Sequence, residues 1–136
     1  QSYCPDHYSM QLALTQDYDQ FYEKEIRYRH LIGFPPFTRL VLWRIEARQE
    51  DYARGKAWEL YELLKAGGDC AGVTILPPVE APIYRIRDYY RWQVALKSRD
   101  YKLFRPVVNQ PAVVKLLSTR RKDLRIVQDI DPWEML

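Results

Sequence analysis

Two periodicities follow one another in this chain, and their order most constrains the fold that it can adopt. Residues 38–47 (TRLVLWRIEA) partly alternate and are rich in β-branched and aromatic side chains, a pattern that predicts a strand. Across residues 50–66, apolar side chains recur at helical spacing, which predicts a helix that Gly67 and Gly68 end. A strand that leads directly into an amphipathic helix favours a layered domain in which helices cover a sheet.

Three further extended segments follow, at residues 73–83, 91–98 and 124–130. Prolines interrupt the first, so it is predicted to be an edge strand or an irregular one, and the link that follows it is expected to form a hairpin tip. Between the second and the third, a helical region is predicted to start near Asp100, break near Asn109 and restart at Pro111. This order predicts an α+β fold, a four-stranded sheet in split β-α-β-β-α-β order with its helices on one face.

A separate helix is expected to precede this pattern. Residues 1–15 are interpreted as an arm or a linker into the domain. A helix is predicted to begin after Asp17, because Asp17 and Gln20 have the spacing of a capping box. Gly33 and the prolines that follow it end this helix.

The charge of the chain is unevenly distributed. Residues 1–84 contain nine Lys and Arg against twelve Asp and Glu, and residues 85–136 contain twelve against six, so their net charges are −3 and +6. A basic half suggests a face for an anionic partner such as nucleic acid. The two cysteines lie far apart and fit a reducing cytoplasm, and no apolar run has the length of a membrane span.

No constellation of residues in the sequence points to catalysis. The GxxxxGK[ST], GxGxxG and GxSxG patterns are all absent. Cys4 and His7 have a spacing compatible with two zinc ligands, but a structural zinc site needs four. Asp129 and Asp131 would share one face of a strand, where pairing with an arginine is a simpler expectation than metal binding. A free-standing enzyme is therefore disfavoured, and neither a catalytic residue nor a metal ligand is predicted.

The most informative segment is residues 84–105 (YRIRDYYRWQVALKSRDYKLFR), in which basic and aromatic side chains are interleaved. Basic side chains neutralise phosphates, and aromatic faces stack exposed bases with little sequence preference. The alternative is a strand whose Trp92 and Val94 face the core while the basic residues face solvent, and both can hold because a strand has two faces. The predicted DNA-binding residues are Arg85, Arg87, Tyr89, Tyr90, Arg91, Lys97, Arg99, Tyr101, Lys102 and Arg105.

A second basic run, Arg120, Arg121 and Lys122, closes the last helical region. Cations at this position either stabilise the C-terminal end of a helix or bind an acidic partner. These three residues are predicted to bind a partner.

Five segments of the chain, in the same order, resemble the C-terminal domain of primosomal replication-restart proteins, the PriA-type helicase family also called primosomal protein N-prime. One departure from the family is Pro77, which replaces a glycine and predicts a different path for its loop. The resembling segments are residues 3–8 (YCPDHY), 17–37 with their closing PPF, 78–82 (PVEAP), 91–97 (RWQVALK) and 129–132 (DIDP).

The resemblance implies an S10-like fold, in agreement with the strand and helix order above, and a role in restarting stalled replication forks. It implies that residues 1–34 are an arm and a helix leading from an upstream core, and that residues 35–136 are the C-terminal α+β domain. The family's ATP-binding helicase core and zinc-binding segment would lie upstream, so no cofactor is expected in this chain.

Two functions are compatible with this resemblance. In the first, the segment 84–105 makes the chain a fork-binding module that recognises stalled forks and helps to reload the replicative helicase. In the alternative, the chain is a protein-docking domain that braces the helicase core and receives the acidic tail of single-stranded-DNA-binding protein, with little DNA contact of its own. Both readings expect a cytoplasmic monomer with primosome proteins as partners and without membrane contact.

Overall fold

The structure, a computed structural model, describes residues 4–66, 72–119 and 121–132, and the chain divides after Phe37 into two units. The first unit contains two helices, and the second contains the sheet. Gly67, Gly68, Cys70 and Arg120 lie outside the described residues.

Two helices form the N-terminal unit, α1 (Tyr8–Thr15) and α2 (Tyr18–Ile32). The predicted caps of α2 are confirmed, because the Gln20 amide donates to the Asp17 carboxylate at 3.0 Å and Gly33 ends the helix with φ of 63°. The interpretation of residues 1–15 as an arm missed α1. Its N-cap is His7, whose ring accepts from the Ser9 amide, and histidine is not among the residues that usually mark a helix start.

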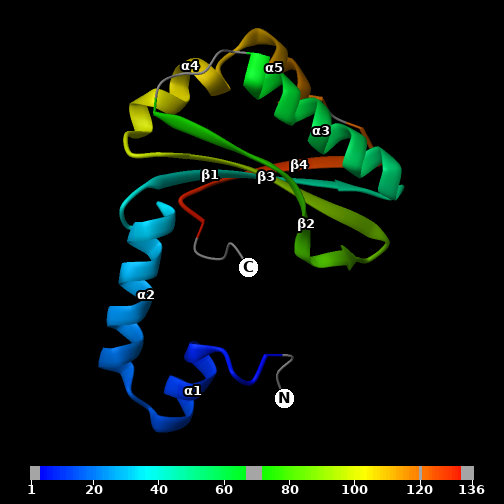
Figure 1. Cartoon of the computed structure of the whole chain (residues 1–136). Coiled ribbons are helices and arrows are strands. Elements are labelled where there is room, and N and C mark those ends of the chain that lie inside the picture. Colours follow the sequence, from blue (N-terminus) through cyan, green and yellow to red (C-terminus); the bar gives the residue numbers. More distant parts are fainter. Residues whose placement is uncertain (1–3, 67–71, 120, 133–136) are drawn as a thin grey trace. The chain divides into compact units, whose positions relative to one another are not determined.

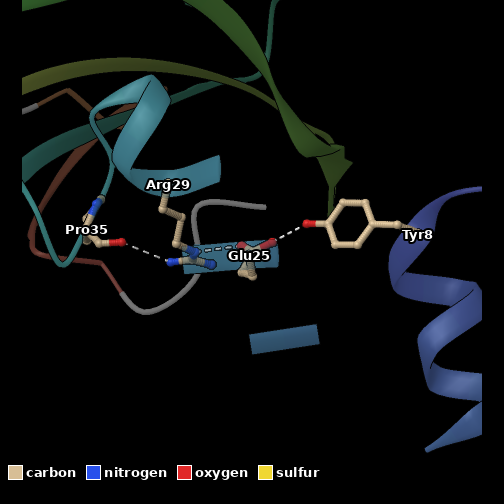
Figure 2. Close-up of polar contacts among 4 residues, drawn as sticks. All are labelled: Tyr8, Glu25, Arg29 and Pro35. Atoms are coloured by element: carbon tan, nitrogen blue, oxygen red, sulfur yellow. Dashed lines mark hydrogen bonds and ion pairs between the residues drawn. The ribbon is translucent and has the colours of Figure 1, made fainter. Parts of the chain in front are cut away.

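Polar side chains of this unit meet at Glu25 of α2 (Figure 2). The Tyr8 hydroxyl of α1 donates a hydrogen bond to the Glu25 carboxylate, and Arg29 Nε donates to it at 2.6 Å. Arg29 Nη1 also donates to the carbonyl oxygen of Pro35 at 3.4 Å. The hydrogen bond from Tyr8, and then that from Arg29, lower the pKa of Glu25, because both favour its charged form.

The second unit has the predicted element order. It runs through β1 (Arg39–Ala47), α3 (Glu50–Ala66), β2 (Val73–Ile86), β3 (Tyr89–Ser98), the 3-10 turn η1 (Tyr101–Leu103), α4 (Phe104–Val108), α5 (Pro111–Leu117) and β4 (Leu124–Ile130). The sheet order is β2-β3-β1-β4, and all neighbours are antiparallel. Because β3 lies between β1 and β2, the split β-α-β-β-α-β prediction is confirmed, and Figure 1 shows α3, α4 and α5 on one face of the sheet.

The core lies between this face and the helices. Alternation along β1 turns Trp43 and Ile45 into it, and α3 contributes Ala57, Leu60 and Leu64, which are fully buried. The helical region after β3 breaks between α4 and α5 as predicted, since Pro111 opens α5 at its first turn.

The β2–β3 hairpin is irregular on its outer strand and tight at its turn. The register shifts between Leu76 and Val79, where Pro77 and Pro78 stand, so β2 is the irregular edge strand that the prolines predicted. The strands extend further than the expected tip, and only Arg87 and Asp88, with φ of 47° and 65°, make the turn. Two residues of positive φ are typical of the turn that matches strand twist. None of the described helices has the length and apolar character that a membrane span requires.

Candidate nucleic-acid interface

A row of charged side chains crosses the second face of the sheet, the face opposite α3, α4 and α5. Tyr90 and Trp92 pack against the core, so alternation along β3 turns Arg91 to the second face. The pairing register sets Glu46 of β1 opposite both Arg91 of β3 and Arg125 of β4. The three side chains therefore lie side by side on neighbouring strands.

Arg91 is held by contacts within the protein. Its Nε lies 3.3 Å from Glu46 Oε1, its Nη1 donates to the carbonyl oxygen of Ile83 at 3.1 Å, and its side chain is only 12% exposed. Arg44 Nε donates to the same Glu46 oxygen at 2.9 Å. Arg91 is thus a predicted DNA contact that an internal ion pair holds away from solvent.

Tyr89 lies where three segments meet at the hairpin end of the sheet. The guanidinium carbon of Arg125 is 4.7 Å from the centroid of its ring, and that of Arg48 is 5.8 Å away. The Tyr89 hydroxyl donates to the carbonyl oxygen of Lys122 at 3.3 Å. Interaction with the Tyr89 side chain also raises the pKa of Arg48. One ring therefore contacts the residue after β1, the start of β4 and the loop before β4.

Other cations lie at the same end of the sheet. The Arg85 guanidinium lies 5.0 Å from the centroid of the Tyr90 ring and donates to Asp88 at 2.8 Å, and Arg87 is exposed in the hairpin turn. We define the hairpin-end cluster as Tyr89 with the cations Arg48, Arg85, Arg87, Arg121, Lys122 and Arg125.

Acidic side chains neutralise this cluster only in part. Arg48 Nε lies 3.9 Å from Asp123, and Arg85 pairs with Asp88. All four side chains are more than half exposed, so these pairs are weak and salt-sensitive. The six cations of the cluster and the two acids paired with them together carry a net charge of +4, and polyanions are attracted to such a surface.

The structure divides the predicted DNA-binding residues into two groups. Ser98 pairs with Arg39 and Val73 at the opposite end of the sheet, and β3 has 10 residues, so the groups are separated by roughly 30 Å along the strand. The far group is at or beyond this end and comprises Lys97, Arg99, Tyr101, Lys102 and Arg105. The hairpin-end cluster instead unites Arg85, Arg87 and Tyr89 with Arg121 and Lys122, which the sequence analysis had assigned to partner binding.

The tyrosines of the predicted site differ in their surroundings. Tyr90 packs against the core and contacts the ring of Tyr84 edge-on at 5.5 Å. Burial of the Tyr84 hydroxyl raises its pKa to about 12. Tyr101 in the far group is 46% exposed, with Phe104 at its edge.

Arg48 and Arg125 were not selected from the sequence. Alternation in residues 124–130 does place Arg125 opposite the apolar side of its strand, because Leu124 and Ile126 face the core. No pattern in the sequence around Arg48 predicts that it lies near Arg125. Their approach to Tyr89 depends on the register of three strands.

The other candidate ligands have partners within the protein. His7 caps α1. Asp131 accepts from Arg39 Nη1 and from the Leu40 amide, both at 3.0 Å, which is the arginine pairing that the sequence favoured. Within residues 4–66, 72–119 and 121–132, no three His, Cys, Asp or Glu side chains are grouped as a metal site requires.

Comparison with known protein families shows which family this domain belongs to. The family model described as primosomal protein N C-terminal domain matches residues 30–133. The chain belongs to this family. The match covers every strand of the sheet and all cations of the hairpin-end cluster.

Several relatives carry the name replication restart protein PriA. The protein of Bacillus subtilis is 31% identical over 137 residues, covering 100% of this chain and 17% of the relative. The protein of Borreliella burgdorferi is 31% identical over 116 residues, which cover 85% of this chain and 17% of the relative. The protein of Haemophilus influenzae is 25% identical over 135 residues, which cover 99% of this chain and 18% of the relative. The chain thus spans less than a fifth of the length of these relatives.

Proposed function

We propose that this chain is the DNA-binding module of a replication-restart protein and that it binds stalled replication forks through the hairpin-end cluster. The observation that carries the proposal is the gathering of exposed cations from four segments at one end of the sheet. Cations at fixed positions contact phosphates and release counterions, which supplies most of the affinity for DNA without sequence preference. A fork has no fixed sequence, so recognition of its backbone suits this task.

Family membership supports the biological setting. The relatives are named for replication restart, and the chain matches them over most of its length. Under this proposal its partners are primosome proteins and the replicative helicase. The ATP-dependent helicase activity and the zinc site that the resemblance implies would belong to other parts of the parent protein.

The second candidate is a docking site for an acidic protein tail, as in single-stranded-DNA-binding protein. It is favoured by the exposure of Arg121 and Lys122, which lie on the loop before β4 within the same cluster. Carboxylates of an extended tail can form paired hydrogen bonds with arginine. The two candidates share a surface, so they predict competition between fork DNA and tail peptide.

Fluorescence anisotropy with a labelled fork at several salt concentrations tests the proposal. A triple variant of the hairpin-end cluster, Arg87→Gln, Arg121→Gln and Lys122→Gln, is expected to weaken fork binding and to lower the salt slope by about 2 to 3. The matched control removes the same net charge from the far group with Arg99→Gln, Lys102→Gln and Arg105→Gln. Equal losses in the two variants would show that net charge alone drives binding, and would contradict a local site.

Titration with an acidic tail peptide separates the two candidates. If the chain binds the peptide but not the fork, the docking function is favoured. If it binds the fork and the peptide displaces it, both ligands use the hairpin-end cluster.

A further inference from the structure

The ring of Tyr89 is already in contact with two cations of its own chain. Arg125 and Arg48 both lie within 6 Å of its centroid, and its hydroxyl donates to the carbonyl oxygen of Lys122. A base stacking on the face of the ring that Arg125 covers would have to displace its guanidinium group. This differs from the expectation that Tyr89 stacks on DNA bases.

The neighbouring tyrosines are no better placed for stacking. Tyr52, Tyr84, Tyr89 and Tyr90 are each half-buried at this end of the sheet. Lys56 lies 5.9 Å from the centroid of the Tyr52 ring and Arg85 lies 5.0 Å from that of Tyr90. Single-strand binders combine cations with accessible aromatic faces, whereas duplex DNA presents phosphates outside and stacks its own bases inside.

We infer that Tyr89 is a positioning residue that holds Arg48 and Arg125 as phosphate contacts, and that this site takes the sugar–phosphate backbone of duplex DNA. The inference rests on the proposed function, and it names the ligand of the same site. Arginine side chains lose rotamer freedom when they bind, so a ring that orders two of them in advance lowers this entropic cost. The ring acts through cation–π contact, and the hydroxyl ties it to the loop before β4.

The test compares a labelled duplex with labelled oligo-dT of equal length, both titrated with the 136-residue chain. Tyr89→Leu removes no charge, yet it is expected to weaken duplex binding by about fivefold and to lower its salt slope by about 1, because the two arginines are no longer held together. Binding of oligo-dT is expected to change by less than about twofold. Tyr89→Phe keeps the ring and is expected to retain duplex binding within about twofold.

Tyr61→Leu is the matched control, because Tyr61 also has a cation over its ring, Lys65 at 5.2 Å, but lies on α3. A structural effect of losing a tyrosine would appear in this variant as well, and thermal melting of both reports it. Only a positioning role changes the salt slope without a change of charge.

A second variant keeps the inference testable if Tyr89→Leu does not fold. Arg48→Gln with Arg125→Gln is expected to weaken duplex binding more than oligo-dT binding and to lower the duplex salt slope by about 2. Equal loss on both ligands overturns the inference, as does a Tyr89→Leu variant that loses oligo-dT more than duplex.

The outcomes also separate this inference from the proposed function. If Tyr89→Leu changes neither affinity nor slope while the double arginine variant changes both, the positioning role is wrong and the DNA-binding function stands. If neither of these variants nor the triple variant of the hairpin-end cluster alters DNA binding, both are wrong.

Discussion

Arg91 and Glu46 form an ion pair between neighbouring strands, with Nε and Oε1 3.3 Å apart and side chains only 12% and 15% exposed. Charges shielded in this way interact more strongly than exposed ones, and either of them alone would be costly to bury. Arg44 shares the same carboxylate, so one acidic group holds two arginines on the second face. Glu46 therefore holds Arg44 and Arg91 in place on the second face of the sheet.

Replacement of Glu46 by glutamine should destabilise the domain. Glu46→Gln leaves Arg91 shielded from water without a carboxylate, so we expect the free energy of unfolding to fall by about 2 kcal/mol. Urea denaturation followed by circular dichroism measures the change. Glu62→Gln, at an exposed position of α3, is the matched control and should change stability by less than about 0.5 kcal/mol. A Glu46 variant as stable as this control would show that the ion pair contributes nothing.

Truncation of a core side chain should lower the free energy of unfolding by more than Glu46→Gln does. Leu60 of α3 is fully buried, so Leu60→Ala removes apolar contacts and leaves a cavity, with an expected loss of about 3 kcal/mol. Val114→Ala on α5, where the side chain is 47% exposed, should lose about 0.5 kcal/mol or less. Denaturation of the two variants side by side measures both changes, and similar losses would contradict the packing of α3 on the sheet.

The order of strands and helices could be predicted because its signals are local. The alternation of residues 38–47, the helical spacing of residues 50–66 and the proline at 111 each act within a few positions. The hairpin-end cluster could not be predicted in the same way. Arg48 and Arg125 reach Tyr89 only because β1 pairs with β3 on one side and with β4 on the other, and that register is set by packing of the whole core.

The helix α1 escaped prediction for a different physical reason. It has 8 residues and its N-cap is His7, so it lacks both a long periodic pattern and a usual capping residue. Its contact with α2 through Tyr8 and Glu25 supplies stability that the local sequence does not reveal.

Loss of the Asp17 cap should loosen the first turn of α2. Asp17→Ala removes the acceptor for the Gln20 amide, and such a loss typically costs about 1 kcal/mol of helix stability. Hydrogen exchange of the Gln20 amide should become faster in this variant. Asp17→Asn retains a side-chain oxygen and is the control, expected to exchange much as the parent does. Equal exchange in the alanine variant and the parent would mean that the cap does not protect this turn.

The pH response of the N-terminal unit should depend on Tyr8. Its hydrogen bond is the main reason why the pKa of Glu25 is lowered, and Arg29 adds to it. Because the pKa is lower in the folded state, these contacts stabilise the unit above the ordinary glutamate pKa of about 4.3, and the stability is lost as the pH falls through the folded value. Tyr8→Phe should therefore raise the pKa of Glu25, which carbon-13 titration of its carboxyl group measures. Tyr22→Phe, at an exposed position of α2, should leave it unchanged. If both variants titrate as the parent does, the Tyr8 hydroxyl does not stabilise the charged carboxylate.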